Sequence, residues 1–220
     1  MRKVRVGIWG FGAMGIGMAN MILKKEGIEI VSVCSRSTSG KSMYDVLGIE
    51  RGERPEVIIN KNYEEVFREK SVDVVLLATD SFTKKAFDKI IFLLNRKINV
   101  ISTAEQMAYP QADDADLAKK MDEVAKENGV SILGTGINPG FVLDLLVLAL
   151  SGTCEEVTSI KAKRVNDLSP FGKSVMEEQG VGVTREEFIK GVEDKTIAGH
   201  VGFVESINMI ADGLGWKLDK

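Results

Sequence analysis

The chain has 220 residues, of which 44% are hydrophobic and 28% charged, and its formal net charge is −3. This length allows one large domain, or a domain of ~150 residues with a smaller second one. The composition is ordinary for a globular protein. The small negative charge, without a cluster of lysines and arginines among aromatic residues, argues against nucleic acid as a partner.

Cysteine spacing and hydropathy argue against further classes of protein. Cys34 and Cys154 lie in no CxxC or Cys/His pattern, so neither a disulfide framework nor a metal site is expected. The longest apolar run, Phe141–Leu150, contains Asp144 and has about half of the ~20 residues that a membrane helix needs. The first residues lack the apolar segment of a secretory signal. We therefore expect a cytoplasmic protein without a membrane partner.

The N-terminal segment predicts a dinucleotide site. A short apolar strand, Val4–Trp9, leads directly into a GxGxxG turn formed by Gly10, Phe11, Gly12, Ala13, Met14 and Gly15. In such turns the first glycine permits a tight turn, the second lets the backbone approach a pyrophosphate, and the third lets the next helix pack closely on the strand. The free N–H groups at the start of that helix attract phosphates. We favour a dinucleotide site over a purely structural turn.

The following helix and strand complete a strand-helix-strand unit. We expect the helix to bury one apolar face, which consists of Met14, Met18, Met21 and Ile22. Basic residues followed by a glycine predict the end of this helix near 24–27. Ile28–Cys34 is then the second strand.

The residues after the second strand bear on the type of dinucleotide. An NAD-specific site usually has an acidic residue ~20 positions beyond the glycines, which binds the ribose 2′-OH. Here the chain has Ser35, Arg36 and Ser37 instead. A guanidinium binds phosphate in a fork geometry, with hydroxyl groups beside it. The pattern favours NADP with Arg36 on the 2′-phosphate; use of NAD as well, or an Arg36 that is only solvated, stays open.

The next hundred residues alternate between strands and helices. Strands are expected at Val57–Ile59, Val72–Thr79, Ile98–Ser102 and Val130–Leu133. Helices are expected near 63–67, 82–94 and 113–128, the second of them capped by Asp80 or Ser81. This alternation predicts an α/β fold with a doubly wound parallel (Rossmann) sheet, in a domain over residues 1–150.

A glycine-rich loop at 134–140 follows the last of these strands. Ligands bind at the carboxyl edge of such sheets, so we expect Thr79 and Gly136 to contact the cofactor and Asn138 the substrate. Beyond an apolar helix at 141–150, alternation predicts a strand at Val157–Val165. A capping box at Thr184 and a last helix at 200–212 follow. We expect a second, smaller α+β domain over residues 151–220.

Glu105 is the first candidate for catalysis. It follows the strand Ile98–Ser102, in a loop that we expect to pass near the nicotinamide ring. A carboxylate held in a partly dry site can act as a base near neutral pH. The alternative is that Glu105 begins a helix and interacts with its N-terminal dipole. The spacing alone leaves both interpretations open.

Arg164, Asn166 and His200 are candidates for substrate binding. Arg164 and Asn166 lie two positions apart on the expected strand, so their side chains would share one face. An arginine there would bind a carboxylate and the asparagine would form a hydrogen bond, although the pair could equally be an exposed sheet face. His200, the only histidine, could transfer a proton, bind substrate or be structural.

Five segments carry a resemblance to a known family. They are VGIWGFGAMG, STAEQMAYP, GTGINPGFVLDLLVLALSG, KRVND and GHVGFVESINM. With them the sequence resembles the 2,4-diaminopentanoate dehydrogenase family, which is part of the wider dihydrodipicolinate-reductase-like group of Rossmann oxidoreductases. The resemblance covers essentially the whole chain. Members of the family continue beyond the position of Lys220, so the resemblance implies that the second domain is incomplete here.

The resemblance implies an activity and roles for the candidate residues. The activity is NAD- or NADP-dependent oxidative deamination of 2,4-diaminopentanoate at C4 to 2-amino-4-oxopentanoate, in ornithine degradation. Glu105 would take the ammonium proton and later help a water attack the iminium, and Arg164 would anchor the substrate carboxylate. We expect a small diamino acid as the partner molecule and a homodimer, because second-domain sheets of this kind often pair.

Two alternatives to this activity remain at the level of sequence. One is a non-catalytic dinucleotide-binding module. The other is a reductase of another small acid with a C=N or C=O bond, which Arg164 would also permit. Dihydrodipicolinate reductase itself is disfavoured, because its histidine pair and lysine have no counterpart here.

Overall fold

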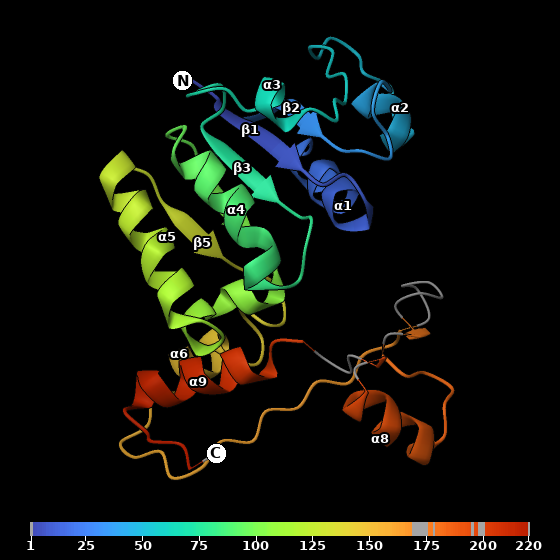
Figure 1. Cartoon of the computed structure of the whole chain (residues 1–220). Coiled ribbons are helices and arrows are strands. Elements are labelled where there is room, and N and C mark those ends of the chain that lie inside the picture. The colour runs from blue at the N-terminus through green and yellow to red at the C-terminus, as the bar shows by residue number, and fades with distance from the viewer. Residues whose placement is uncertain (1, 169–175, 178, 195, 198–200, 220) are drawn as a thin grey trace. The chain divides into compact units, whose positions relative to one another are not determined.

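The structure is a computed structural model of the whole chain, and it describes residues 2–168, 176–177, 179–194, 196–197 and 201–219. The chain forms two compact units, Met1–Gly136 and Ile137–Lys220. Figure 1 shows the elements of both units, coloured in chain order. The domain boundary at residue 150 stays a prediction. Among the described residues, no helix combines the length and the apolar character needed to cross a membrane.

The first unit is built on a five-stranded parallel sheet with the order β2-β1-β3-β4-β5. The strands are β1 (Val4–Trp9), β2 (Ile28–Cys34), β3 (Val74–Leu77), β4 (Asn99–Ser102) and β5 (Ile132–Gly134). Trp9 at the end of β1 is in register with Cys34 and Leu77, so the carboxyl ends of β2, β1 and β3 form one edge. The chain adds β2 on one side of β1 and β3 on the other, which makes β1 a topological switch point. The predicted doubly wound parallel sheet is confirmed.

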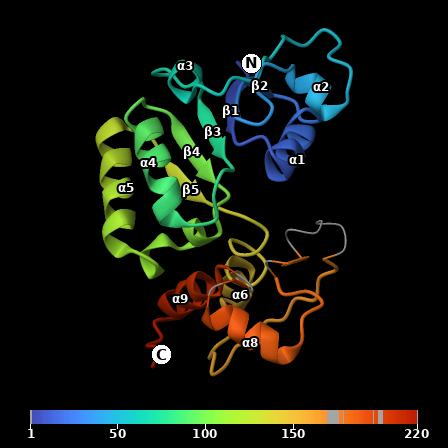
Figure 2. The ribbon, with the colours of Figure 1, turned by 45° about the vertical axis from the view of Figure 1, so that its right-hand side comes forward.

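Helices cover both faces of this sheet. They are α1 (Ala13–Ile22), α2 (Met43–Leu47), α3 (Tyr63–Val66), α4 (Thr83–Leu94) and α5 (Ala115–Asn128), with two 3-10 helices, η1 (Glu105–Ala108) and η2 (Pro110–Ala112). Side chains alternate along β3: Val75 and Leu77 pack with α4 and α5, whereas Val74 and Leu76 pack on the side of α1 and α2. Figure 2 shows α4 and α5 side by side.

Helix α1 buries only part of the face predicted for it, because Met18 and Ile22 are half-buried and Ile22 packs against the core. Met14 and Met21 are 61% and 59% exposed, and the buried residues are Gly15 and Ala19. A Cβ placed on Gly15 would collide with the backbone of Gly10, so this helix lies against the chain with its smallest residues inward. The close approach turns Met14 and Met21 outward. The helix also ends at Ile22, before the predicted 24–27.

Two local predictions in the first unit are wrong in detail. The strand expected at Val57–Ile59 is reduced to isolated bridges, which pair Ile58 with Ser42 and Asn60 with Cys34. Neither Asp80 nor Ser81 caps α4: the N-cap is Phe82, without a side-chain cap bond, and the N–H of Thr83 donates to Gln106 Oε1 at 3.0 Å. The cap is thus supplied by tertiary structure, because η1 brings Gln106 to the start of the helix.

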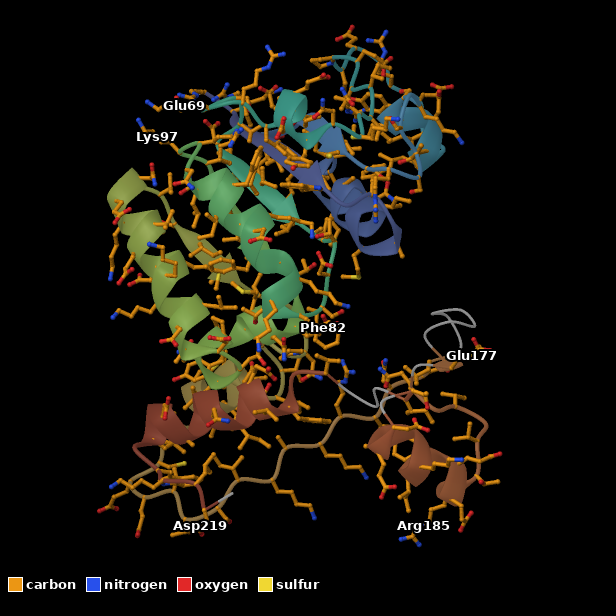
Figure 3. The ribbon with its side chains drawn as sticks, viewed as in Figure 1. Glu69, Phe82, Lys97, Glu177, Arg185 and Asp219 are labelled. Carbon is orange, nitrogen blue, oxygen red and sulfur yellow. The ribbon has the colours of Figure 1, made fainter. Side chains whose placement is uncertain are left out.

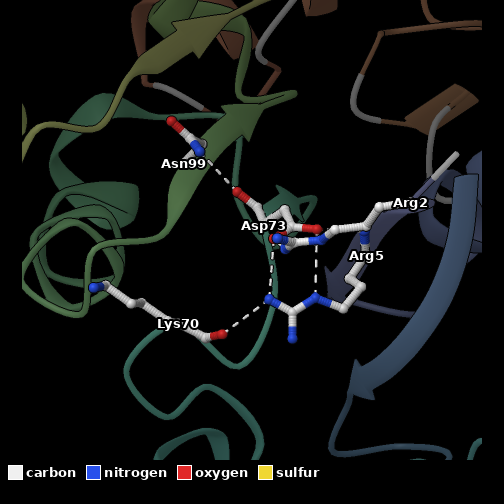
Figure 4. A network of polar contacts seen from close by, with 5 residues as sticks. All are labelled: Arg2, Arg5, Lys70, Asp73 and Asn99. Carbon is white, nitrogen blue, oxygen red and sulfur yellow. Dashed lines mark hydrogen bonds and ion pairs between the residues drawn. The ribbon is translucent and has the colours of Figure 1, made fainter.

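Two sets of ionic contacts stabilise the end of the first unit at which β1 and β3 begin. Figure 3 labels Glu69 and Lys97 there, which form an ion pair of 3.3 Å. Nearby, Asp73 accepts hydrogen bonds from the Arg5 backbone N–H at 2.8 Å and from Arg5 Nη2 at 3.0 Å (Figure 4). These hydrogen bonds from Arg5, reinforced by its charge, lower the pKa of Asp73 to about 2. The network ties the start of β1 to the start of β3.

The second unit consists of helices in its described part, namely α6 (Leu145–Ser151), α8 (Arg185–Glu193) and α9 (Phe203–Leu214). The buried Asp144 caps α6 through the N–H of Leu145 at 2.6 Å, and it accepts from Ser206 Oγ on α9 at 2.8 Å. The capping box predicted at Thr184 is confirmed, with Glu187 as its second member.

The strand predicted at Val157–Val165 is wrong. Residues 155–168 have no regular secondary structure and are almost all exposed. An alternating pattern forms a stable strand only where a neighbouring strand supplies hydrogen bonds. The described residues of the second unit contain no such partner strand.

Candidate functional site

A pocket of about 600 Å³ lies at the carboxyl edge of β1, β2 and β3. It is formed by residues at the end of each strand and directly after it, at 9–12, 34–37 and 78–80, together with Lys61, Tyr63 and Lys89. This is the topological switch point, where open α/β sheets bind ligands. Another cavity, of about 560 Å³, is lined by Lys3, Ile28 and neighbours at the starts of β1 and β2, away from the glycine turn.

The pocket brings together seven of the residues predicted to bind a cofactor, namely Gly10, Phe11, Gly12, Ser35, Arg36, Ser37 and Thr79. Four others do not line it. Ala13, Met14 and Gly15 form the first turn of α1, and Gly136 follows β5. Their contribution to cofactor binding stays a prediction.

The glycines of the turn differ in what the fold requires of them. Gly10 has φ +99°, and a Cβ there would lie 2.7 Å from the carbonyl carbon of Ala78. The backbone therefore requires glycine at this position. At Gly12, by contrast, no atom of the described residues lies within 4 Å of such a Cβ. Packing within the protein does not require Gly12, but its missing side chain leaves open space at the pocket.

The start of α1 is equally suited to phosphate. Its N-cap is Gly12, which offers no side chain to the first N–H groups of the helix. Those groups have no partner within the helix and carry its positive dipole end. The open space at Gly12, which we call the phosphate cradle, and these donors fit the pyrophosphate of a dinucleotide.

A charged pair forms one wall of the pocket. Asp80 Oδ2 accepts from Lys89 Nζ at 2.7 Å and from Thr79 Oγ1 at 2.6 Å. Burial opposes ionisation of Asp80, but these hydrogen bonds outweigh it and lower its pKa. The Asp80 carboxylate is therefore ionised at neutral pH, and it holds Thr79 at the edge of the pocket.

An apolar wall stands beside it. Trp9 and Tyr63 stack with ring centroids 4.9 Å apart and an interplanar angle of 21°. Cys34 is buried, and burial raises the pKa of its thiol to about 11, so it stays neutral. A neutral thiol and two stacked rings present an apolar surface, of the kind on which a flat base can rest.

Sequence reasoning missed seven lining residues, namely Trp9, Cys34, Lys61, Tyr63, Ala78, Asp80 and Lys89. Asp80 comes soon after β3, so its position at the carboxyl edge of the sheet could have been predicted, although its residue type suggested only a helix cap. Lys61 and Tyr63 enter through the bridge between Cys34 and Asn60, and Lys89 reaches the pocket from α4. No local sequence pattern predicts that these three residues line the pocket.

Glu105 lies in the first unit at the first residue of η1, directly after β4, and it is half-buried. The helix-start position considered as an alternative is thus observed. The loop is tied to neighbouring segments, since Thr103 N donates to Leu77 O and Gln106 N to Ser81 O. Glu105 does not line the 600 Å³ pocket. Its catalytic role stays a proposal.

The substrate-binding candidates belong to the second unit. Asn138 is half-buried and precedes the buried Pro139, while Arg164 and Asn166 are exposed in the irregular segment at 155–168. Because no strand forms there, the argument that their side chains share one face is wrong. His200 lies outside the described residues.

Two protein families match the chain. Residues 5–132 match the semialdehyde dehydrogenase, NAD binding domain family, and residues 141–220 match the 2,4-diaminopentanoate dehydrogenase C-terminal domain family. A 2,4-diaminopentanoate dehydrogenase of Acetoanaerobium sticklandii is 63% identical over 219 residues. The alignment covers 99% of this chain but 62% of that relative. The resemblance inferred from the sequence is confirmed.

Solved structures support the fold. An amine dehydrogenase from Mycobacterium smegmatis has a TM-score of 0.82 at 23% identity, over 99% of this chain and 63% of that one. The WlbA dehydrogenase from Bordetella pertussis has a TM-score of 0.51 at 17% identity, over 69% of this chain and 40% of that one. At such identities the likeness concerns the fold alone. Because the match at residues 5–132 spans more than half of the sequence, the chain belongs to the semialdehyde dehydrogenase, NAD binding domain family, and its first unit is an NAD(P)-binding domain.

Proposed function

We propose that this protein is an NAD(P)-dependent amine dehydrogenase that converts 2,4-diaminopentanoate to 2-amino-4-oxopentanoate. The observation that carries the proposal is the 63% identity, over 99% of this chain, to a protein named 2,4-diaminopentanoate dehydrogenase. The pocket at the switch point, with its phosphate cradle at Gly12, supports the dinucleotide part of the proposal.

The overall reaction balances as an oxidation followed by hydrolysis. The substrate ammonium, oxidised cofactor and water give the ketone, ammonium, reduced cofactor and one proton. The C4–H bond breaks with its electron pair, and the C–N bond is then replaced by C=O. When bound, NAD(P) supplies the hydride acceptor.

In this proposal Glu105 handles the proton. The carbon can release a hydride only when its amine is neutral, so the carboxylate would first take a proton from the ammonium group. The same carboxylate would then hold the water that attacks the oxidised carbon. Its position directly after β4, at the carboxyl edge of the sheet, supports this assignment.

The substrate would be held by residues of the second unit. We assign Arg164 to the substrate carboxylate, because a guanidinium forms paired hydrogen bonds with it. Asn138, Asn166 and His200 are assigned hydrogen bonds to the substrate. Such positioning lowers the barrier by ordering the reactants before the chemical step.

The test compares Glu105→Gln with Glu127→Gln, which makes the same change on the exposed side of α5. We expect Glu105→Gln to lower kcat by roughly 10²-fold or more, the usual range for loss of a general base. Cofactor affinity and the activity of Glu127→Gln should be unchanged. Full turnover by Glu105→Gln would show that the role is wrongly assigned, and cofactor binding without turnover by the unaltered chain would favour a binding module.

Two further expectations stay predictions. The homodimer was inferred from a second-domain sheet, and the described residues of that unit contain no strand, so this reasoning no longer supports it. Light scattering would decide the oligomeric state. The cytoplasmic location can be tested by cell fractionation.

A further inference from the structure

We propose that Lys61 joins Arg36 in binding the 2′-phosphate of NADP and is therefore a residue that determines cofactor specificity. The inference rests on the dinucleotide site of the proposed function and not on its substrate. Lys61 and Arg36 line the same pocket as Gly10 and Gly12, although they lie 25 positions apart in the sequence.

The backbone holds Lys61 beside the end of β2. Asn60 pairs with Cys34 in a parallel bridge, in which Ser35 N donates to Asn60 O at 3.0 Å and Asn60 N donates to Val33 O at 3.1 Å. The thiol of Cys34 also points at the Lys61 carbonyl, at 3.9 Å. Because the bridge is parallel, the chain leaves it in the same direction as β2 does. Lys61 thus emerges at the edge where Arg36 emerges.

The positive charges of Arg36 and Lys61 are not neutralised by an acidic side chain among the described residues. Among the described lining residues the only acid is Asp80, which is already bound to Lys89 at 2.7 Å. Within the described part of the chain, neither Arg36 nor Lys61 forms an ion pair. The carboxylate of Glu65 on the adjoining α3 accepts from the side-chain amides of Asn60 and Asn62 instead. Two cations therefore remain available to an anion.

The chemistry of this pair fits a phosphate better than a ribose hydroxyl. An NAD-specific site places a carboxylate at the end of β2 to accept from the 2′-OH. Here that position has the cation Arg36, flanked by the hydroxyls of Ser35 and Ser37, whose oxygens are 3.4 Å apart. A phosphate monoester carries close to two negative charges near neutral pH. The fork of Arg36 and the point charge of Lys61 match such a group together.

The experiment uses two nucleotides that differ only in the group concerned. Calorimetric titration of the full chain with 2′,5′-ADP and with 5′-AMP measures the contribution of the 2′-phosphate without any substrate. We expect Lys61→Ala and Arg36→Ala each to weaken 2′,5′-ADP binding by about tenfold, the scale of one charge-assisted hydrogen bond. Binding of 5′-AMP should change less than about twofold. Lys41→Ala, which removes an exposed lysine outside the pocket, should alter neither affinity.

Each other outcome contradicts the proposal in a defined way. Equal losses for both nucleotides in Lys61→Ala would place Lys61 on the 5′-phosphate. Unchanged affinities for both nucleotides in Lys61→Ala would show that Lys61 does not contribute and that Arg36 acts alone. If the unaltered chain bound 5′-AMP as tightly as 2′,5′-ADP, it would have no 2′-phosphate site. Failure to turn over 2,4-diaminopentanoate would leave these titrations unaffected and would contradict only the proposed function.

Discussion

The first unit covers both faces of its sheet, whereas the second unit leaves many apolar side chains of α6, α8 and α9 exposed. In the first unit the strands place alternate side chains into two cores, one against α4 and α5 and one against α1 and α2. In the second unit the buried apolar side chains, among those described, are Pro139, Ile197, Ile210 and Ala211. A buried polar residue, Asp144, joins the start of α6 to α9 through hydrogen bonds there. The cofactor site therefore belongs to the unit with the more extensive apolar core.

Separating the units gives the largest expected effect. We expect residues 1–136 alone to unfold cooperatively and to keep the affinity for NADP, because both cores lie within them. Residues 137–220 alone should show no cooperative transition, because they bury too little apolar surface. Thermal unfolding followed by circular dichroism makes the measurement. A sharp transition in the 137–220 fragment would break the comparison.

A matched pair of isoleucines tests the difference in burial between the two units. Ile90 on α4 is 0% exposed and Ile207 on α9 is 51% exposed. Ile90→Ala should lower the free energy of unfolding by about 4 kcal/mol, because it removes buried surface and leaves a cavity. Ile207→Ala should cost less than about 0.5 kcal/mol. Urea denaturation of both variants tests this, and equal losses would show that α9 is buried in solution.

Substitutions at two glycines distinguish effects on stability from effects on cofactor binding. Gly10→Ala should lower the free energy of unfolding by about 2 kcal/mol or more, since it forces a Cβ into the backbone of Ala78 at a positive φ. Gly12→Ala should leave stability within about 0.5 kcal/mol but weaken NADP binding by about tenfold, because its methyl group would occupy the phosphate cradle. Denaturation and titration of each variant give both quantities. Normal NADP affinity in Gly12→Ala would contradict the cradle.

The Asp73 network should produce the smallest effect. Its folded pKa, about 2, lies below the ordinary 3.8, so the ionised form stabilises the fold above that ordinary value and the gain disappears as the pH falls toward 2. The side chain is 29% exposed, so solvent screening reduces the gain to about 1 kcal/mol. Asp73→Asn should cost that amount at pH 7 and nothing near pH 2.

The exposed Asp88→Asn on α4 serves as the control for this change. Its stability should follow that of the unaltered protein at every pH. If Asp73→Asn kept its deficit at low pH, the loss would come from packing and not from the charge.

Local signals predicted much of the fold. The apolar runs of β1 and β3, the glycine stop after α5 and the capping box at Thr184 all depend on residues close together in the sequence. The cofactor residues that directly follow β1, β2 and β3 could be found for the same reason, because parallel strands bring their carboxyl ends to one edge. Predictions failed where the outcome depended on a distant partner, as for the strand expected at 157–165.

By itself, the sequence determined that a parallel sheet carries a dinucleotide at its switch point, since backbone conformation at Gly10 and strand periodicity are local properties. The tertiary structure alone decided which charges meet the ligand. The bridge at Asn60 places Lys61 in the same pocket as Arg36, and Lys89 reaches Asp80 from α4. It also decided that α1 buries Gly15 and Ala19 and not Met14 and Met21. Such contacts depend on how closely two elements approach, and no pattern within one element records that distance.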